Sequence, residues 1–257
     1  MSERYKFTVN LAREAGEKIL MLKEKYLVVS IKNNDPRDLV TNVDIEISNF
    51  ISDHIKETFP GETIYSEEAD VDIVGGSFWA LDPIDGTKNF VRDLPFFSTV
   101  IAYVENGESV VGAVYNPVTK ELFSFEKDKG AFLNSKPINV SDKTELNKSV
   151  VFLTTGRTKE YWDWGAKVYR FLLENTHSVR GMSSSALDIC FVASGRSEAC
   201  IYANLTTLDS IAAIGILREA GGIIEGKSGP IDAVSKTPQM LVAANNREVL
   251  DALKAVI

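Results

Sequence analysis

The chain has 257 residues, of which 44% are hydrophobic and 25% are charged, a composition ordinary for a soluble globular protein with a sizeable core. Its formal net charge of −8 argues against bulk binding to nucleic acid or to an anionic membrane surface. No apolar run approaches the length of a membrane span and no apolar signal segment follows Met1, so we expect a cytoplasmic protein.

The first part of the chain predicts two amphipathic helices. Apolar residues recur at helical spacing from Ser2 to Lys25, and a second such pattern runs from Thr41 through Ile55. Between them, residues 28–41 form a polar stretch that we interpret as a loop and as a candidate mobile flap over a site.

Acidic residues then appear at three places, and at each they could have a structural role or bind a ligand. Asp44 stands near the start of the second helix, where helix capping is the simpler explanation. A short strand over 61–66 delivers Glu67 and Glu68, which either face solvent or include a ligand at the carboxyl end of the strand. An apolar run ending at Leu81 predicts a further buried strand, directly before the third group of acids.

That third group, Leu81-Asp82-Pro83-Ile84-Asp85-Gly86-Thr87, is the stretch around which the site is predicted. Pro83 predicts a tight exit from the strand, Gly86 allows close approach of the backbone to a ligand, and Thr87 begins a short helix. Acids at a strand end, beside the N–H groups of a helix start, can hold Mg²⁺ and a phosphate together. An Asx-Pro turn with an N-cap is the plain structural alternative.

The remainder predicts antiparallel strands followed by strand–helix alternation. Strands are expected at 96–103, 109–115, 121–126, 130–133, 149–154, 178–180, 199–202 and 240–243, and helices at 161–173, 185–192, 206–220 and 247–256. The polar stretch 136–148 is the best boundary between two subdomains, which we place at 1–140 and 141–257 of one compact unit. This order suggests a layered α+β fold.

The residues argue against two other phosphatase signatures and against a zinc site. Cys190 and Arg196 have the C-x5-R spacing of cysteine phosphatases, but Phe191-Val192-Ala193 after the cysteine is apolar and not a Gly-rich anion loop, which favours a buried structural cysteine. Asp82 and Asp85 are three residues apart rather than the two of an Asp-x-Asp nucleophile pair. Neither histidine of the chain has another metal-ligand residue type at a suitable spacing.

Four separated segments, in order, resemble the inositol monophosphatase family of Mg²⁺-dependent, often lithium-sensitive phosphomonoesterases. Residues 82–90 resemble its first signature, and Asp209-Ser210-Ile211-Ala212-Ala213 with Glu219-Ala220-Gly221-Gly222 resembles the second. Lys32 with residues 38–44, and Ser66-Glu67-Glu68, match its two upstream metal segments. The resemblance implies a layered α/β/α/β/α sandwich with the site between the two halves, and assembly as a homodimer or homotetramer.

The resemblance also implies which residues bind two to three Mg²⁺ ions. The first ion would be held by Glu67, Asp82 and the carbonyl of Ile84, and the second by Asp82, Asp85 and Asp209. Ligation by oxygen atoms alone suits Mg²⁺.

The same resemblance assigns catalytic and phosphate-binding groups. Asp44, with Glu67, would support a weaker third ion, mostly through water. Glu67 and Thr87 would position and deprotonate the attacking water, and the N–H groups of Gly86 and Thr87 would hold the phosphate, beside the metal ligands Asp85 and Asp209.

The residues expected around the alcohol part of the substrate depart from the family pattern. Leu208 stands where tryptophan is common, Tyr202 where inositol-preferring animal enzymes have glutamate, and Ser183 where they usually have glycine. Arg157, Arg180 and Tyr202 are predicted contacts to the alcohol part or to a second phosphate, with a surface salt bridge an equal alternative for each arginine.

The sequence therefore predicts a phosphomonoesterase acting on a small sugar or polyol phosphate, inositol-1-phosphate and/or fructose-1,6-bisphosphate. One alternative is a 3′-phosphoadenosine 5′-phosphate nucleotidase, although no aromatic sandwich for a base is evident beyond Tyr161, Trp162 and Trp164. Another is a catalytically dead phosphate-binding regulator, against which the intact set of acids argues.

Overall fold

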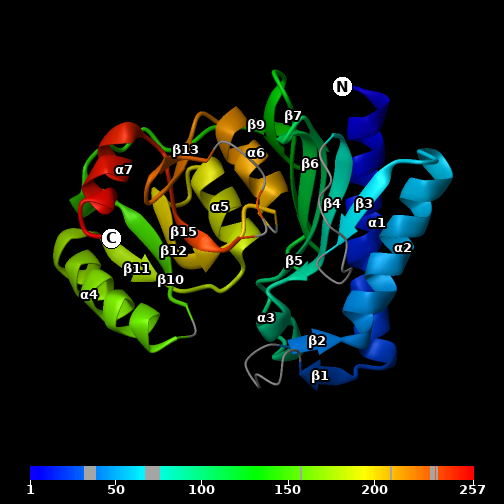
Figure 1. Cartoon of the computed structure of the whole chain (residues 1–257), viewed down its shortest axis with the longest axis horizontal. Helices are drawn as coiled ribbons and strands as arrows, with labels where there is room; N and C mark the ends of the chain where they lie inside the picture. The colour runs from blue at the N-terminus through cyan, green and yellow to red at the C-terminus, as the bar shows by residue number, and fades with distance from the viewer. Residues whose placement is uncertain (32–38, 67–75, 157, 209, 232–234, 236) are drawn as a thin grey trace.

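The computed structural model describes residues 1–31, 39–66, 76–156, 158–208, 210–231, 235 and 237–257. Its helices and sheets stack as helix, sheet, helix, sheet, helix (Figure 1). This α/β/α/β/α sandwich confirms the layered fold expected from the sequence. No helix within the described ranges is long and apolar enough to cross a membrane.

The first sheet comes from the first half of the chain. Its strands lie in the order β3-β4-β5-β6-β7-β8-β9. Their bounds are β3 (Thr63–Ser66), β4 (Phe78–Asp85), β5 (Ser98–Glu105), β6 (Glu108–Asn116), β7 (Glu121–Glu126), β8 (Gly130–Leu133) and β9 (Lys136–Ile138), and helix α3 (Thr87–Val91) follows β4. β3 pairs parallel to β4 and the later neighbours pair antiparallel.

Helices α1 (Glu3–Lys25) and α2 (Asn42–Thr58) cover the outer face of this sheet. Each has a side-chain cap, because the Ser2 hydroxyl accepts the Tyr5 N–H at 3.1 Å and Thr41 forms a reciprocal capping box with Asp44. Their apolar stripes pack against the sheet around the fully buried Trp79. This burial fixes α2, and therefore Asp44, against the sheet that contains the other acids.

The second sheet comes from the second half of the chain, in the order β11-β10-β12-β15-β13-β14. Its strands are β10 (Val150–Thr154), β11 (Ser178–Arg180), β12 (Ala199–Leu205), β13 (Ile223–Gly226), β14 (Gly229–Pro230) and β15 (Gln239–Ala244), and the 3-10 helix η1 (Leu146–Lys148) precedes them. Helices α4 (Lys159–Asn175) and α7 (Arg247–Lys254) cover its outer face, while α5 (Ser185–Ala193) and α6 (Ile211–Glu219) lie between the two sheets (Figure 1).

Helix α6 approaches the first sheet closely because a glycine faces it. A Cβ atom added to Gly215 would lie 2.1 Å from the ring of Phe125, so a larger residue would force the helix away from β7. The same packing fixes the N-terminal end of α6, where Ser210 follows the predicted ligand Asp209.

Three details of the predicted secondary structure are wrong. The stretch 28–41, predicted as a loop, contains strands β1 (Val29–Ile31) and β2 (Leu39–Thr41), which pair antiparallel. The helix predicted over 206–220 begins only at Ile211, and β13 and β14 were not foreseen. Strands of two to four residues are too short to show a convincing alternation of apolar and polar residues. The predicted flap residues 32–38 lie outside the described ranges.

A further correction concerns the central motif. The strand predicted to end at Leu81 continues to Asp85, with a shift in its register against β5 between Asp82 and Asp85. Pro83, which lacks a backbone N–H, sits in this irregularity, where a strand tolerates proline. The division at residue 140 stays a prediction; β9 ends at Ile138 and β10 begins at Val150.

Candidate active site

The end of β4 presents two buried carboxylates, Asp82 and Asp85. An oxygen of Asp82 accepts the N–H of Ile84 at 3.0 Å, and the Ile84 carbonyl accepts the hydroxyl of Thr87 at 3.0 Å. These bonds hold a carboxylate, a carbonyl and a hydroxyl in one turn. These oxygen atoms therefore lie close together, with both acids within the strand, and their binding of a metal stays a prediction.

Asp44 is buried at the start of α2 and serves as a cap. One of its oxygens accepts the N–H of Thr41 at 2.8 Å and the Thr41 hydroxyl at 2.5 Å. The capping explanation is confirmed, and a role for Asp44 beside a metal stays a prediction. The two roles are compatible, because a carboxylate has two oxygens and several acceptor sites.

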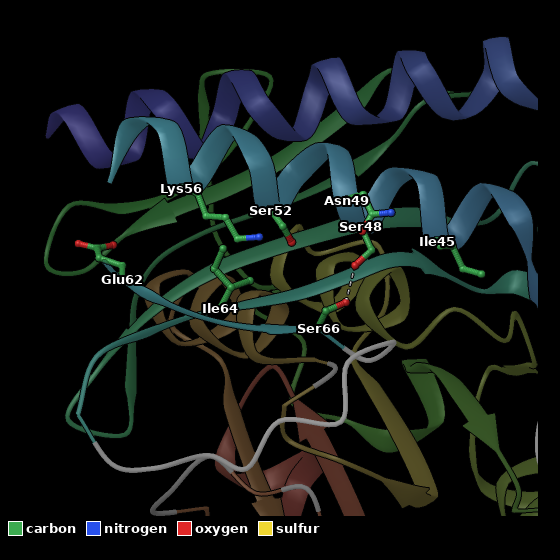
Figure 2. A pocket seen from close by; sticks show the side chains of 8 residues that line it. All are labelled: Ile45, Ser48, Asn49, Ser52, Lys56, Glu62, Ile64 and Ser66. Carbon is green, nitrogen blue, oxygen red and sulfur yellow. Dashed lines mark hydrogen bonds between the residues drawn. The ribbon is translucent and has the colours of Figure 1, made fainter. Parts of the chain in front are cut away.

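A hydrogen bond between hydroxyls brings the start of α2 to the end of β3. Ser48, one helical turn after Asp44, lies with its Oγ 2.8 Å from the Oγ of Ser66 (Figure 2). Ser66 is the last residue of β3 and pairs with the residue of β4 that precedes Asp82. The start of α2 with Asp44 therefore lies beside the carboxyl end of β3, and Asp82 follows on the neighbouring strand β4. The predicted ligand Glu67 follows Ser66 but lies outside the described residues.

Asp85 connects the two halves of the chain at the N-terminus of α5. Its carboxylate accepts the hydroxyl of Ser184, the N–H and hydroxyl of Ser185 at 3.0 and 3.1 Å, and the N–H of Ala186 at 3.1 Å. The Ser98 hydroxyl lies 3.5 Å away. Burial raises the pKa of Asp85, and these donors counteract that rise. Every donor is neutral, so none of these contacts balances the carboxylate charge.

The segment after Asp85 also touches both halves. Gly86 has φ +89°, and a Cβ atom there would lie 3.1 Å from the Phe96 carbonyl and 3.3 Å from the Cβ of Ser184. The position thus requires glycine for its backbone conformation and for space. The amide of Asn89 donates to the carbonyls of Phe96 and Met182, both at 2.7 Å. The start of α3 is therefore fixed against the segment that precedes α5.

The start of α6 reaches the same place. Ser210, its N-cap residue, lies with its Oγ 3.4 Å from the Oγ of Ser185, which also contacts Asp85. The predicted ligand Asp209 precedes Ser210 and lies outside the described residues. Sequence analysis identified Asp209 but gave Ser184 and Ser185 no role beyond the expectation of a helix from residue 185.

The predicted substrate-contacting residues have different surroundings. Ser183 is exposed with φ +60°, a backbone conformation that favours glycine. Arg180 is exposed at the end of β11 and donates to the carbonyl of Val179 at 2.9 Å. Arg157 lies outside the described residues. Contacts of these three with a substrate stay predictions.

Tyr202 is buried on β12 beneath α5, next to an acid that sequence analysis did not single out. Its hydroxyl lies 3.2 Å from Asp188 Oδ2 and 3.3 Å from the Ser185 carbonyl. Asp188 is fully buried, and its other oxygen has no hydrogen-bond partner within the described part of the chain. Burial, and then the charge of Asp85, raise the pKa of Asp188 well above its ordinary value. The one available signal was a single acid within the apolar helix 185–193.

A surface pocket of about 510 Å³ lies between α2 and β3 (Figure 2). Its lining residues are Ile45, Ser48, Asn49, Ser52, Lys56, Glu62, Ile64 and Ser66. Of the described residues, neither Asp82 nor Asp85 lines it, so the pocket borders the acids without containing them. Two of the lining residues, Ser48 and Ser66, form the hydrogen bond that joins the two elements.

The donors gathered at the two halves suit a hard divalent cation. No three His, Cys, Asp or Glu side chains within the described ranges are close enough to hold a metal by themselves. The described oxygen ligands are Asp82, Asp85 and the Ile84 carbonyl, and among the described residues only neutral groups donate to the buried Asp85. A cation bound by oxygens supplies the missing positive charge, so the donor chemistry fits Mg²⁺.

The cysteine chemistry considered from the sequence is not supported. Cys190 is a fully buried free thiol on α5, and burial raises the pKa of its thiol well above the ordinary value. We therefore expect Cys190→Ala to retain near-normal phosphate release while lowering the free energy of unfolding by about 1 kcal/mol, the scale for losing one buried heavy atom. Phosphate assays and urea unfolding test this; loss of activity in a folded variant would contradict it.

Comparisons with known proteins agree with this geometry. Residues 1–256 match the family model described as the inositol monophosphatase family. A Thermotoga maritima fructose-1,6-bisphosphatase/inositol-1-monophosphatase is 35% identical over 227 residues, covering 88% of this chain and 86% of that protein. An inositol-1-monophosphatase of Bacillus subtilis is 35% identical over 221 residues, covering 84% and 83%. The solved structure of extragenic suppressor protein suhB from Bartonella henselae superposes with a TM-score of 0.91 at 28% identity, covering 99% of this chain and 98% of that one.

Proposed function

Because this chain belongs to the inositol monophosphatase family and is a phosphoric monoester hydrolase, we propose that it hydrolyses a small sugar or polyol phosphate with Mg²⁺. The observation that supports the use of a cation most directly is Asp85. This buried carboxylate joins both halves of the chain, yet within the described part of the chain its hydrogen-bond donors are all neutral.

We propose that two to three Mg²⁺ ions are held by Glu67, Asp82, the Ile84 carbonyl, Asp85 and Asp209. When bound, such ions lower the pKa of a water molecule and neutralise charge on the phosphate and the leaving oxygen. Asp82 and Ile84 are fixed by the hydrogen bonds within their own turn. Asp85 is supported by α5, so both halves would contribute to one metal site.

The remaining roles belong to side chains and backbone groups around this turn. Glu67 and Thr87 would orient the attacking water and accept its proton, and Asp44 would act with Glu67. The hydroxyl of Thr87 already has a fixed direction, since it donates to the Ile84 carbonyl at 3.0 Å. The first N–H groups of a helix have no partner within that helix, so those at Gly86 and Thr87 would bind phosphate oxygens.

For the substrate, we propose inositol-1-phosphate and/or fructose-1,6-bisphosphate. The names of the Thermotoga and Bacillus relatives support this pair. Ser183 and Arg180 lie on the segment that leads into α5, and with Arg157 and Tyr202 they would surround the alcohol part. Since Tyr202 is buried and bonded to Asp188, its contribution would pass through the position of Ser185.

Release of inorganic phosphate from three substrates, each with Mg²⁺ and with excess EDTA, tests the proposal. Inositol-1-phosphate and fructose-1,6-bisphosphate should be hydrolysed only with Mg²⁺, and 3′-phosphoadenosine 5′-phosphate poorly. Preference for the nucleotide would instead support the nucleotidase alternative. Full activity in EDTA would refute the metal mechanism, and binding without turnover of all three would support a regulator.

A further inference from the structure

The pocket between α2 and β3 is separate from the groups to which hydrolysis is assigned, since neither Asp82 nor Asp85 lines it. Its volume of about 510 Å³ falls within the range of sites that bind small molecules. It opens at the edge of the first sheet, where β3 is the outermost strand. The pocket therefore has the size and the access that a ligand site requires.

The hollow exists because α2 has small residues where it passes β3. Ile47, Ile51 and Ile55 are fully buried against the first sheet. Beside them, Ser48 and Ser52 stand one helical turn apart on the side of α2 that faces β3 (Figure 2). A residue the size of leucine at either position would fill the space, so the serines keep it open.

The pocket has one acidic and one basic side chain, and only the acid is tightly paired. Glu62 accepts two N–H groups of Arg4 at 2.7 and 2.8 Å and the indole N–H of Trp79 at 2.6 Å. The bonds from Arg4 hold the pKa of Glu62 below its ordinary value. Among the described residues, Lys56 is ion-paired with Asp53 alone, at 3.9 Å, and both side chains are mostly exposed, which makes a weak pair. The charge available to an occupant is therefore that of Lys56.

The other lining groups suit a hydroxylated molecule. Lys56 follows Ser52 by one turn and extends beneath α2 towards it (Figure 2). The hydroxyl of Ser52 and the amide of Asn49 can each donate and accept hydrogen bonds. Ile45 and Ile64 supply apolar surface at the same place. Together these groups match a small polyol that carries an anionic group. Lys56 also lies in the last turn of α2, where a cation suits the helix dipole, and that role leaves its N–H donors available.

The pocket is joined to the candidate active site by short connections on both of its walls. Ser48 lies one turn after Asp44, and its hydroxyl is 2.8 Å from that of Ser66. Ser66 pairs with Leu81, the residue before Asp82. A molecule held by α2 and β3 together would restrain both elements. A second ligand that binds to groups already restrained loses less conformational entropy.

We propose that this pocket binds a small hydroxylated anion, a sugar acid or a sugar phosphate, and that its occupant strengthens Mg²⁺ binding at the neighbouring acids. Lys56 binds the anionic group, and Asn49 and Ser52 bind hydroxyl groups. The binding itself does not depend on the proposed reaction, whereas its effect on Mg²⁺ rests on the proposed metal site.

Titration of the full chain in EDTA with gluconate, glucose 6-phosphate and glucose, followed by ¹H–¹⁵N NMR, tests the binding without metal and without turnover. An anion should bind and shift the amide signals of Asn49, Ser52 and Ile64, and glucose should bind at least about tenfold more weakly because it lacks the charge. Binding of gluconate alone identifies a carboxylate site, and binding of glucose 6-phosphate alone a phosphate site. Binding of neither anion, equal binding of glucose, or shifts confined to other residues would overturn the proposal.

Two variants, each with a matched control, test the location with the anion that binds more tightly. Lys56→Met should weaken binding at least about tenfold, and Lys129→Met, on the exposed turn between β7 and β8, should not. Ser52→Leu should abolish binding by filling the pocket, whereas Thr58→Leu adds the same side chain at an exposed position of α2 outside the pocket. Circular dichroism checks folding. Binding that survives both Lys56→Met and Ser52→Leu would overturn the site.

Isothermal titration with Mg²⁺ tests the effect on the metal. With the same anion at saturation, the dissociation constant of Mg²⁺ should fall at least about fivefold in the wild type and stay constant in Lys56→Met. Any anion bound at the active site itself would affect both proteins alike. An equal change in both, or none, would overturn the coupling. A wild type that binds no Mg²⁺ at all would contradict the proposed function, while the titrations in EDTA would still decide whether the pocket binds an anion.

Discussion

Asp85→Asn is expected to abolish Mg²⁺-dependent phosphate release, lowering kcat/KM by at least about a thousandfold, because metal stabilisation of the transition state amounts to several kcal/mol. Asparagine has nearly the shape of aspartate and keeps one oxygen, which can accept either from Ser185 or from Ser184 and Ala186. It lacks the charge with which a carboxylate binds a cation. The variant should also bind Mg²⁺ more weakly by isothermal titration calorimetry, a measurement that requires no turnover.

The exposed Asp142 provides the matched control, since Asp142→Asn makes the same chemical change on the surface. It should leave activity and Mg²⁺ affinity unaltered. Because burial raises the pKa of Asp85, removing its charge should not unfold the protein. Thermal unfolding in EDTA checks this. An active Asp85→Asn variant with unchanged Mg²⁺ affinity would exclude Asp85 from the metal site.

Local sequence was sufficient for the turn between Asp82 and Thr87. Its acids, glycine and helix start lie within six consecutive residues, so spacing alone specifies which groups meet. The cap formed by Thr41 and Asp44 was predictable for the same reason. The end of β4 could not be predicted in this way. Pro83 indicates locally that the chain leaves the strand, but pairing with β5 extends the strand past it to Asp85.

The surroundings of Asp85 could not be predicted from spacing. Ser184, Ser185 and Ala186 are about 100 residues away in the chain, and only the packing of α5 between the two sheets brings them to Asp85. Three consecutive serines before an apolar run indicate a helix start and nothing about its partner. The resemblance to a family supplied the remote predicted ligands Glu67 and Asp209, but the serines that support Asp85 became evident only in the structure.

Asp188 is the second residue whose role depends on this packing, and Asp188→Asn should change the pH dependence of stability. Since burial raises the pKa of Asp188, the folded chain keeps a proton that the unfolded chain releases above about pH 4. The unfolded state then binds fewer protons, so the free energy of unfolding of the wild type falls as pH rises. The fall is about 1.4 kcal/mol per pH unit until the pH reaches the pKa of the folded state.

Asparagine cannot ionise, so this contribution disappears in the variant while the acceptor for the Tyr202 hydroxyl remains. At pH 4 the variant should match the wild type or be about 1 kcal/mol less stable, because the amide adds a buried donor. Its advantage should grow as the pH rises above 4, until the pH reaches the raised pKa of Asp188 in the folded state. Urea unfolding in EDTA at five pH values measures the difference, with Asp142→Asn as the control for an exposed acid. A difference independent of pH would mean that Asp188 is ionised in the folded protein, with a positive charge near its second oxygen.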